Sequence, residues 1–136
     1  MFRLKDYTSV ISKFKPVSHV TILDHRGIDI DYNCIGKYIN LYIANIEFID
    51  MLDGEYTCLI KLSSKIGSRN VTRRPIRFSE LLDCLANKEV IVVPFNDRTK
   101  EIYWDWIDDG SLQDKNVVNI VPVFNKKRTL LQVYIL

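Results

Sequence analysis

Apolar and polar residues alternate in several short runs of this chain, which is the pattern of strands with one buried face. A β-branched run at 17–23 is followed by turn residues at 24–27 and by renewed alternation at 28–31, which predicts a hairpin. A further strand is predicted over 56–62. The stretch 37–48 fits both strand and helix spacing, and its branched and aromatic residues favour the strand.

Helical spacing occurs in two places. Between residues 6 and 14, apolar side chains recur at three- and four-residue intervals, with Asp6 as the candidate N-cap and Pro16 just beyond the end. The second helix is expected to begin at Ser79 as its N-cap, with Glu80 in the first turn, where the helix dipole favours an acid. One or two helices are therefore expected to pack on one face of a sheet.

The last part of the chain has the pattern of strands alone, over 90–95, 101–107, 117–124 and 130–135. Short connections of this kind join antiparallel neighbours, so these segments predict a four-stranded meander. The fold class is therefore α+β, with residues 1–136 forming a single domain around a mainly antiparallel sheet.

The apolar strand at the C-terminus, 130–136, is either central in its sheet or an edge that could recruit another chain. At an edge, two copies could pair by strand addition. The basic turn before it, Lys126, Lys127 and Arg128, would bring like charges together in many such pairings. We therefore expect a monomer or a weak homodimer.

Composition is that of an average soluble domain, with 136 residues of which 47% are hydrophobic and 26% charged. No apolar run is long enough to span a membrane, and charges interrupt the region where a secretory signal would lie. The three cysteines are too far apart for a disulfide framework or a metal motif and are expected to be reduced: Cys34, Cys58 and Cys84. These features predict a cytoplasmic protein.

Candidate chemistry is sparse. His19 and His25 are the two histidines, and both lie in the first predicted hairpin, where structural roles are expected. The sequence has no nucleophile motif, no glycine-rich phosphate loop and no zinc-ligand spacing. We therefore expect no catalytic residues, no metal and no cofactor.

One acidic pair points to an enzymatic alternative. Asp29 and Asp31 are predicted on one face of a strand, and Lys61 follows on a later strand, which resembles the restriction-endonuclease-like pattern of Mg²⁺-dependent nucleases. Leu59 stands where that pattern has a second acid, and Glu55 is a poor substitute. The structural alternative is a solvated strand face that carries both aspartates.

Charge is unevenly distributed although the net charge is only +2. The segment 56–79 contains six basic residues and no acid, whereas 101–114 contains five acids and no base. Residues 63–75 predict an exposed loop, which would present arginines suited to phosphate or to carboxylates on a partner protein. The candidate binding residues here are Lys65, Arg69, Arg73, Arg74 and Arg77.

Trp104 and Trp106 share one face of the predicted strand 101–107. If that face meets the helices, the indoles belong to the core. If it does not, they form an aromatic patch of the kind found at interface hot spots. Both residues are therefore candidate binding residues.

Taken together, these features predict a small protein that acts by binding another protein, as an inhibitor or neutraliser in the manner of immunity proteins or phage anti-host factors. This expectation rests on a polarised surface and on the lack of catalytic motifs. The alternative is a nucleic-acid-binding protein that uses the basic loop, with the nuclease as its extreme form.

Overall fold

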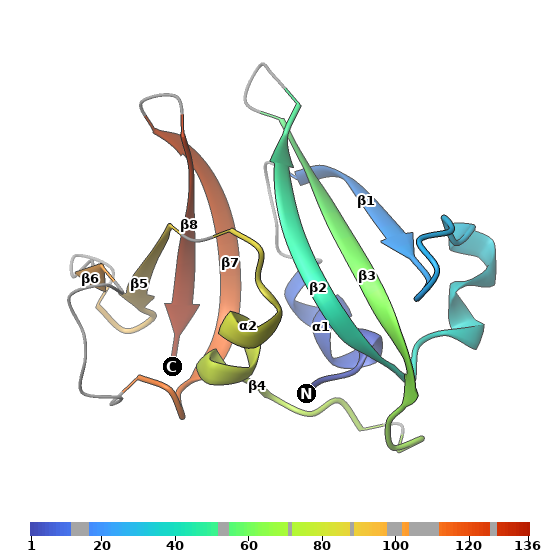
Figure 1. Cartoon of the computed structure of the whole chain (residues 1–136). Coiled ribbons are helices and arrows are strands. Elements are labelled where there is room, and N and C mark those ends of the chain that lie inside the picture. The colour runs from blue at the N-terminus through green and yellow to red at the C-terminus, as the bar shows by residue number, and fades with distance from the viewer. Residues whose placement is uncertain are drawn as a thin grey trace.

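The computed structural model describes residues 1–11, 17–51, 55–70, 72–87, 89–97, 102–103, 112–125 and 128–136. It is an α+β structure with two mixed sheets and a few short helices (Figure 1). The helices are α1 (Leu4–Ile11), η1, a 3₁₀ helix (Tyr32–Lys37), and α2 (Phe78–Cys84). None of the helices in the described part of the chain is long and apolar enough to cross a membrane.

The first sheet has the strand order β1-β3-β2. Its strands are β1 (Val17–Leu23), β2 (Leu41–Asp50) and β3 (Tyr56–Ile66). β3 is central, pairing antiparallel with β2 and parallel with β1. The alternation of β3 appears directly in its burial, because Tyr56, Cys58, Ile60 and Leu62 are buried and the residues between them are not.

The second sheet has the strand order β4-β7-β8-β5-β6. Its strands are β4 (Ile76–Arg77), β5 (Val90–Pro94), β6 (Ile102–Tyr103), β7 (Asn116–Asn125) and β8 (Arg128–Ile135). β8 lies in the interior, antiparallel to β7 and parallel to β5. The unbroken apolar run of β5 fits this position, since Val90, Ile91, Val92 and Val93 are all buried.

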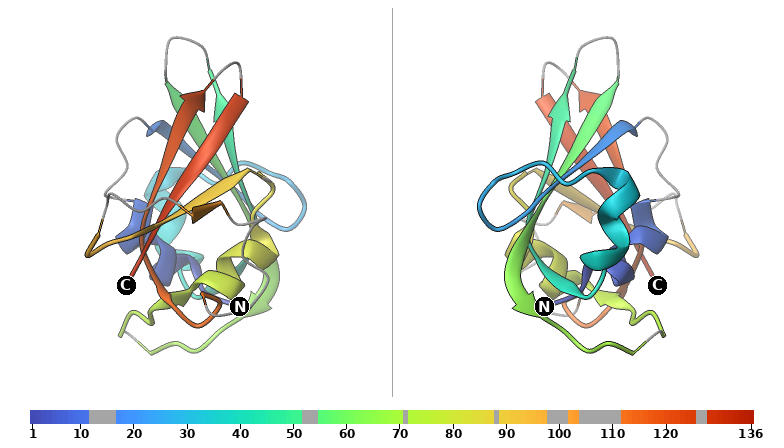
Figure 2. Two further views of the ribbon diagram at one scale, coloured as in Figure 1. Left: turned by 90° about the vertical axis from the view of Figure 1, so that its left-hand side faces the viewer. Right: turned by 90° about the vertical axis from the view of Figure 1, so that its right-hand side faces the viewer.

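One contiguous core contains buried side chains from both sheets and both α-helices, including Tyr7 of α1, Ile60 of β3, Leu81 of α2 and Val133 of β8. Figure 1 shows the sheets side by side with α2 in front and α1 behind, and Figure 2 shows the same layers from both sides. The helices thus pack between two sheets, whereas the sequence predicted helices on one face of a single sheet.

The free edge of β2 is covered by main-chain and side-chain hydrogen bonds from two other segments. Near its start, the Ile43 N–H donates to the Phe2 carbonyl at 3.0 Å. Near its end, the Asn87 side chain accepts from the Phe48 N–H at 2.8 Å and donates to the Phe48 carbonyl at 3.1 Å. This amide occupies the place of a neighbouring strand, which leaves fewer unpaired groups on the edge.

Several predicted boundaries need correction. The second strand of the first hairpin is only an isolated bridge between Leu23 and Asp29. α1 begins two residues before Asp6, and α2 begins one residue before Ser79. The residue just before each helix, Arg3 or Arg77, donates its N–H to the acid three positions later, whereas the sequence pattern predicted Asp6 and Ser79 as the caps.

The predicted meander is correct only in part. β5 with β6 and β7 with β8 are antiparallel pairs, as expected. However, β6 is not a neighbour of β7; the parallel pairing of β5 with β8 joins the two hairpins instead. The C-terminal strand is therefore central, and the strand-addition homodimer considered for that edge has no free edge to use.

Candidate functional site

The predicted basic residues lie on one continuous stretch that runs from the end of β3 to β4 along the lower side of the molecule in Figure 1. β3 continues to Ile66, so the loop is 67–75, shorter than predicted. Four exposed cations on this stretch have no ion pair within the described residues. We call them the basic strip: Lys65, Arg69, Arg73 and Arg77.

The loop 67–75 is anchored by the buried side chain of Arg3, which was not among the residues predicted from the sequence. Arg3 is 5% exposed, and its guanidinium donates to three loop carbonyls. These are Ser68 at 2.5 Å, Asn70 at 2.8 Å and Thr72 at 2.9 Å. One guanidinium therefore holds the loop backbone at three separate carbonyls.

Local turns support the same loop conformation. The Ser68 hydroxyl accepts from the Asn70 N–H at 3.2 Å, and the Asn70 side chain accepts from the Thr72 N–H at 3.1 Å. Such side-chain turns are a common role of Ser and Asn in loops. The serine and asparagine content that predicted a loop therefore also shapes it.

Asp6 completes the anchor. Its carboxylate accepts from the Arg3 side chain at 2.8 and 3.1 Å, from the Arg3 N–H at 3.0 Å and from the Arg74 N–H at 2.7 Å. Burial alone would raise the pKa of Asp6, but the hydrogen bonds from Arg3 and Arg74 outweigh it and lower the pKa. The carboxylate is thus ionised and links α1 to both ends of the loop.

Glu80 plays a similar role at the start of α2. Its carboxylate accepts from the Arg74 guanidinium at 2.7 and 3.1 Å, from the Arg77 N–H at 3.3 Å and from the Met1 amine at 2.8 Å. Burial alone would raise the pKa of Glu80, but these donors outweigh it and lower the pKa to about 2. Arg74 is therefore paired, unlike the four residues of the basic strip.

Gly67 lets the loop pass close to Arg3. A Cβ at this position would lie 2.9 Å from Arg3 Cγ and 2.9 Å from two ring atoms of Tyr42. Contacts this short require the neighbours to move. The glycine is thus needed for a close approach and not for a special backbone angle.

We expect Gly67→Ala to lower the free energy of unfolding by about 1 to 3 kcal/mol, the usual cost of overpacking. Gly36→Ala is the matched control, because a Cβ there has no atom within 4 Å. The control should be neutral or slightly stabilising. Urea denaturation of both variants measures the difference, and equal stabilities would show that the loop adjusts freely around position 67.

The other candidate residues are not brought into this site. Trp104 and Trp106 lie outside the described residues. Whether they belong to the core or to an interface is therefore not tested by the structure. Asp31 caps η1, its side chain accepting from the Asn33 N–H at 3.0 Å, so Asp29 and Asp31 do not share a strand as the nuclease pattern required. No group of three or more His, Cys, Asp or Glu side chains in the described ranges could hold a metal ion.

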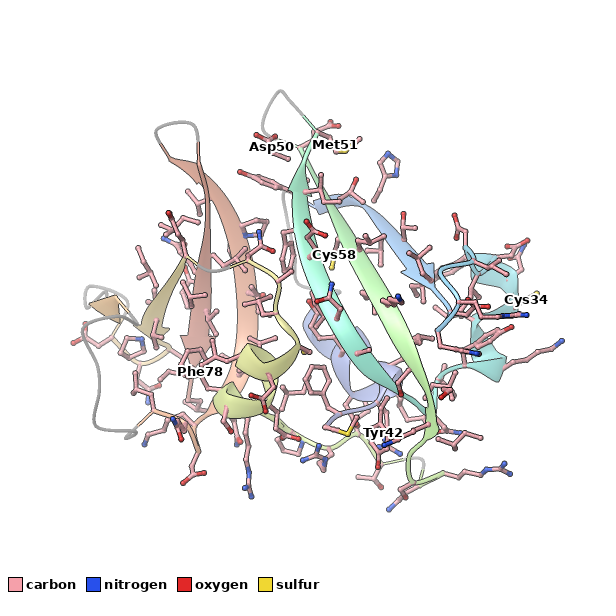
Figure 3. All side chains as sticks on the ribbon, viewed as in Figure 1. Cys34, Tyr42, Asp50, Met51, Cys58 and Phe78 are labelled. Atoms are coloured by element: carbon pink, nitrogen blue, oxygen red, sulfur yellow. The ribbon has the colours of Figure 1, made fainter. Side chains whose placement is uncertain are left out.

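The cysteines are free thiols, with Cys58 and Cys84 buried and Cys34 exposed. Figure 3 labels Cys34 and Cys58.

Comparisons with protein-family models, with curated proteins and with solved structures found no match to this chain. The basic strip and the buried side chains that support it are therefore the features of the molecule that point to a function.

Proposed function

We propose that this protein acts by binding another protein, and that the basic strip docks on an acidic surface of that partner. The observation that carries the proposal is the combination of four exposed cations without ion pairs and a loop backbone fixed by the buried Arg3. Complementary charge of this kind steers association and fixes orientation.

Preorganisation supports binding by this loop. A loop that is ordered before binding loses less conformational entropy when it docks, so more of the contact energy appears as affinity. The anchoring carboxylates, Asp6 and Glu80, pair with Arg3 and Arg74 and leave the strip's own cations available. We further propose that covering the partner's surface is the activity itself, as for an inhibitor or neutraliser.

The loop chemistry favours a protein over a nucleic acid as the partner. Proteins that bind single strands interleave aromatic side chains with the cations so that bases can stack, and residues 63–75 contain no aromatic side chain. Arginine, in turn, pairs well with carboxylates through its planar fork of donors.

The test compares two sets of neutralising substitutions in the full chain. The strip variant carries Lys65→Gln, Arg69→Gln, Arg73→Gln and Arg77→Gln, and the control carries Lys37→Gln and Lys61→Gln, which remove exposed cations elsewhere. A partner captured by the wild type is purified and its affinity measured by calorimetry. We expect the strip variant to lose at least about tenfold in affinity and the control less than about threefold.

Two results would contradict the proposal. One is a purified partner that binds the strip variant as tightly as the wild type. The other is binding to duplex or single-stranded DNA or RNA, in the absence of a protein partner, that weakens steeply between about 50 and 200 mM salt, as phosphate contacts do. That second result would establish the nucleic-acid alternative.

A further inference from the structure

A cavity of about 590 Å³, lined mainly by charged and polar residues, lies beside the loop and includes Arg73 of the basic strip. Its walls come from the N-terminal segment, the start of β2, the loop 67–75 and the start of α2. Five charged side chains line it: Arg3, Arg73, Arg74, Asp6 and Glu80. Three cations against two carboxylates give the cavity an excess of positive charge.

The carboxylates in the cavity have no remaining capacity to accept hydrogen bonds. An ionised carboxylate offers about four lone-pair sites. Asp6 accepts four hydrogen bonds, from Arg3 and from the Arg74 N–H. Glu80 also accepts four, from Arg74, the Arg77 N–H and the Met1 amine. A ligand in this cavity would therefore not be held as a donor to either carboxylate.

The loop carbonyls that face Arg3 are engaged as well. Those of Ser68, Asn70 and Thr72 each accept from its guanidinium. The main acceptors around the cavity are therefore satisfied from within the protein. The groups of the cavity that remain available to a ligand are therefore hydrogen-bond donors.

Several donor side chains lining the cavity, the Thr72 hydroxyl among them, make no hydrogen bond with the described residues, and two of these are best suited to an anion. One is the Arg73 guanidinium, which is exposed and has no ion pair there. The other is the hydroxyl of Tyr42, a residue that lines the same cavity. Figure 3 shows Tyr42 at the start of β2.

We infer that this cavity is a carboxylate-binding subsite that receives an Asp or Glu side chain of the partner protein. The planar guanidinium of Arg73 would bind the carboxylate through paired N–H donors, with the Tyr42 hydroxyl as a further donor. The excess positive charge of the cavity offsets the charge of the ligand. This inference rests on the proposed function and names the chemical group that the site recognises.

The test uses the isolated protein and sodium acetate as the carboxylate probe. Acetate replaces sodium chloride at constant ionic strength, at pH 7, while backbone amide signals are followed by NMR. We expect saturable shifts at Tyr42, Arg73 and Arg74. Arg73→Gln should raise the half-saturating acetate concentration by at least about tenfold, because a charged hydrogen-bond partner is lost.

Lys61→Gln is the control, since Lys61 is an exposed cation of β3 that neither belongs to the basic strip nor lines the cavity. It should change the half-saturating acetate concentration by less than about twofold. Shifts that do not saturate, or equal effects of the two substitutions, would overturn the subsite. Inorganic phosphate forms a third arm, and a half-saturation more than about tenfold below that of acetate would replace the carboxylate with a phosphate group.

These outcomes can be separated from failure of the proposed function, because the acetate titration needs no partner. If acetate does not bind while the strip variant loses its protein partner, the subsite is wrong and the proposed function stands. If acetate binds at Arg73 and the partner's affinity is insensitive to the strip, the cavity binds carboxylates, but the proposed function is wrong and the carboxylate does not come from that partner.

Discussion

Replacing Arg3 with methionine is expected to lower the free energy of unfolding by about 3 to 5 kcal/mol, the usual cost of removing one partner of a buried ion pair. The Asp6 side chain is 0% exposed and would lose two of the four hydrogen bonds that it accepts, those from the Arg3 guanidinium, while the main-chain donors Arg3 N–H and Arg74 N–H would remain. Three loop carbonyls would lose their donor at the same time. Urea denaturation followed by circular dichroism measures the change.

Arg26→Met is the control for this prediction. Arg26 also forms an ion pair, with Asp24 at 3.3 Å, but its side chain is 67% exposed. Exposed pairs contribute about 0 to 1 kcal/mol, so this variant should keep nearly all of the stability. Similar losses in the two variants would mean that burial of Arg3 does not determine its contribution.

Deleting Val133–Leu136 is expected to abolish cooperative folding. Val133 is 0% exposed and Ile135 is 5% exposed, and burial of each contributes about 2 kcal/mol. The deletion also removes pairing with β7 on one side and β5 on the other. Small domains have a total stability of about 5 to 15 kcal/mol, so the combined loss should leave the chain largely unfolded.

Deletion of Leu136 alone separates this effect from simple shortening. Leu136 is 58% exposed, and its N–H donates to the Asn116 carbonyl at 2.9 Å. This shorter deletion should cost about 1 kcal/mol and preserve the unfolding transition seen in thermal denaturation. A folded protein after the longer deletion would show that β8 is dispensable.

Strand positions were predictable because alternation is a local signal. The buried residues of β3 follow the pattern directly, and the unbroken apolar run of β5 marks burial on both faces. Strand neighbours were not predictable in the same way. The parallel pairing of Val92 with Val133 joins residues far apart in the chain, and no local spacing distinguishes it from an antiparallel meander.

In the candidate site, too, local features could be predicted from the sequence and long-range contacts could not. The arginines of the basic strip were found because they crowd one segment, whereas Arg3 lies 65 residues or more from the carbonyls it binds. One local signal was available. Arg3 precedes Asp6, and Arg77 precedes Glu80, by three positions, and in each pair the acid accepts from the arginine N–H at a helix start.

The interior place of β8 sets the order in which the two sheets can assemble during synthesis on the ribosome. The strands of the first sheet all lie within residues 17–66, so they can pair while the later half of the chain is still being made. β8 follows every other strand and separates β7 from β5, so the second sheet stays divided until β8 emerges. Until then the core has the first sheet and the helices but lacks the completed second sheet, and transiently exposed apolar surface of this kind is prone to aggregation.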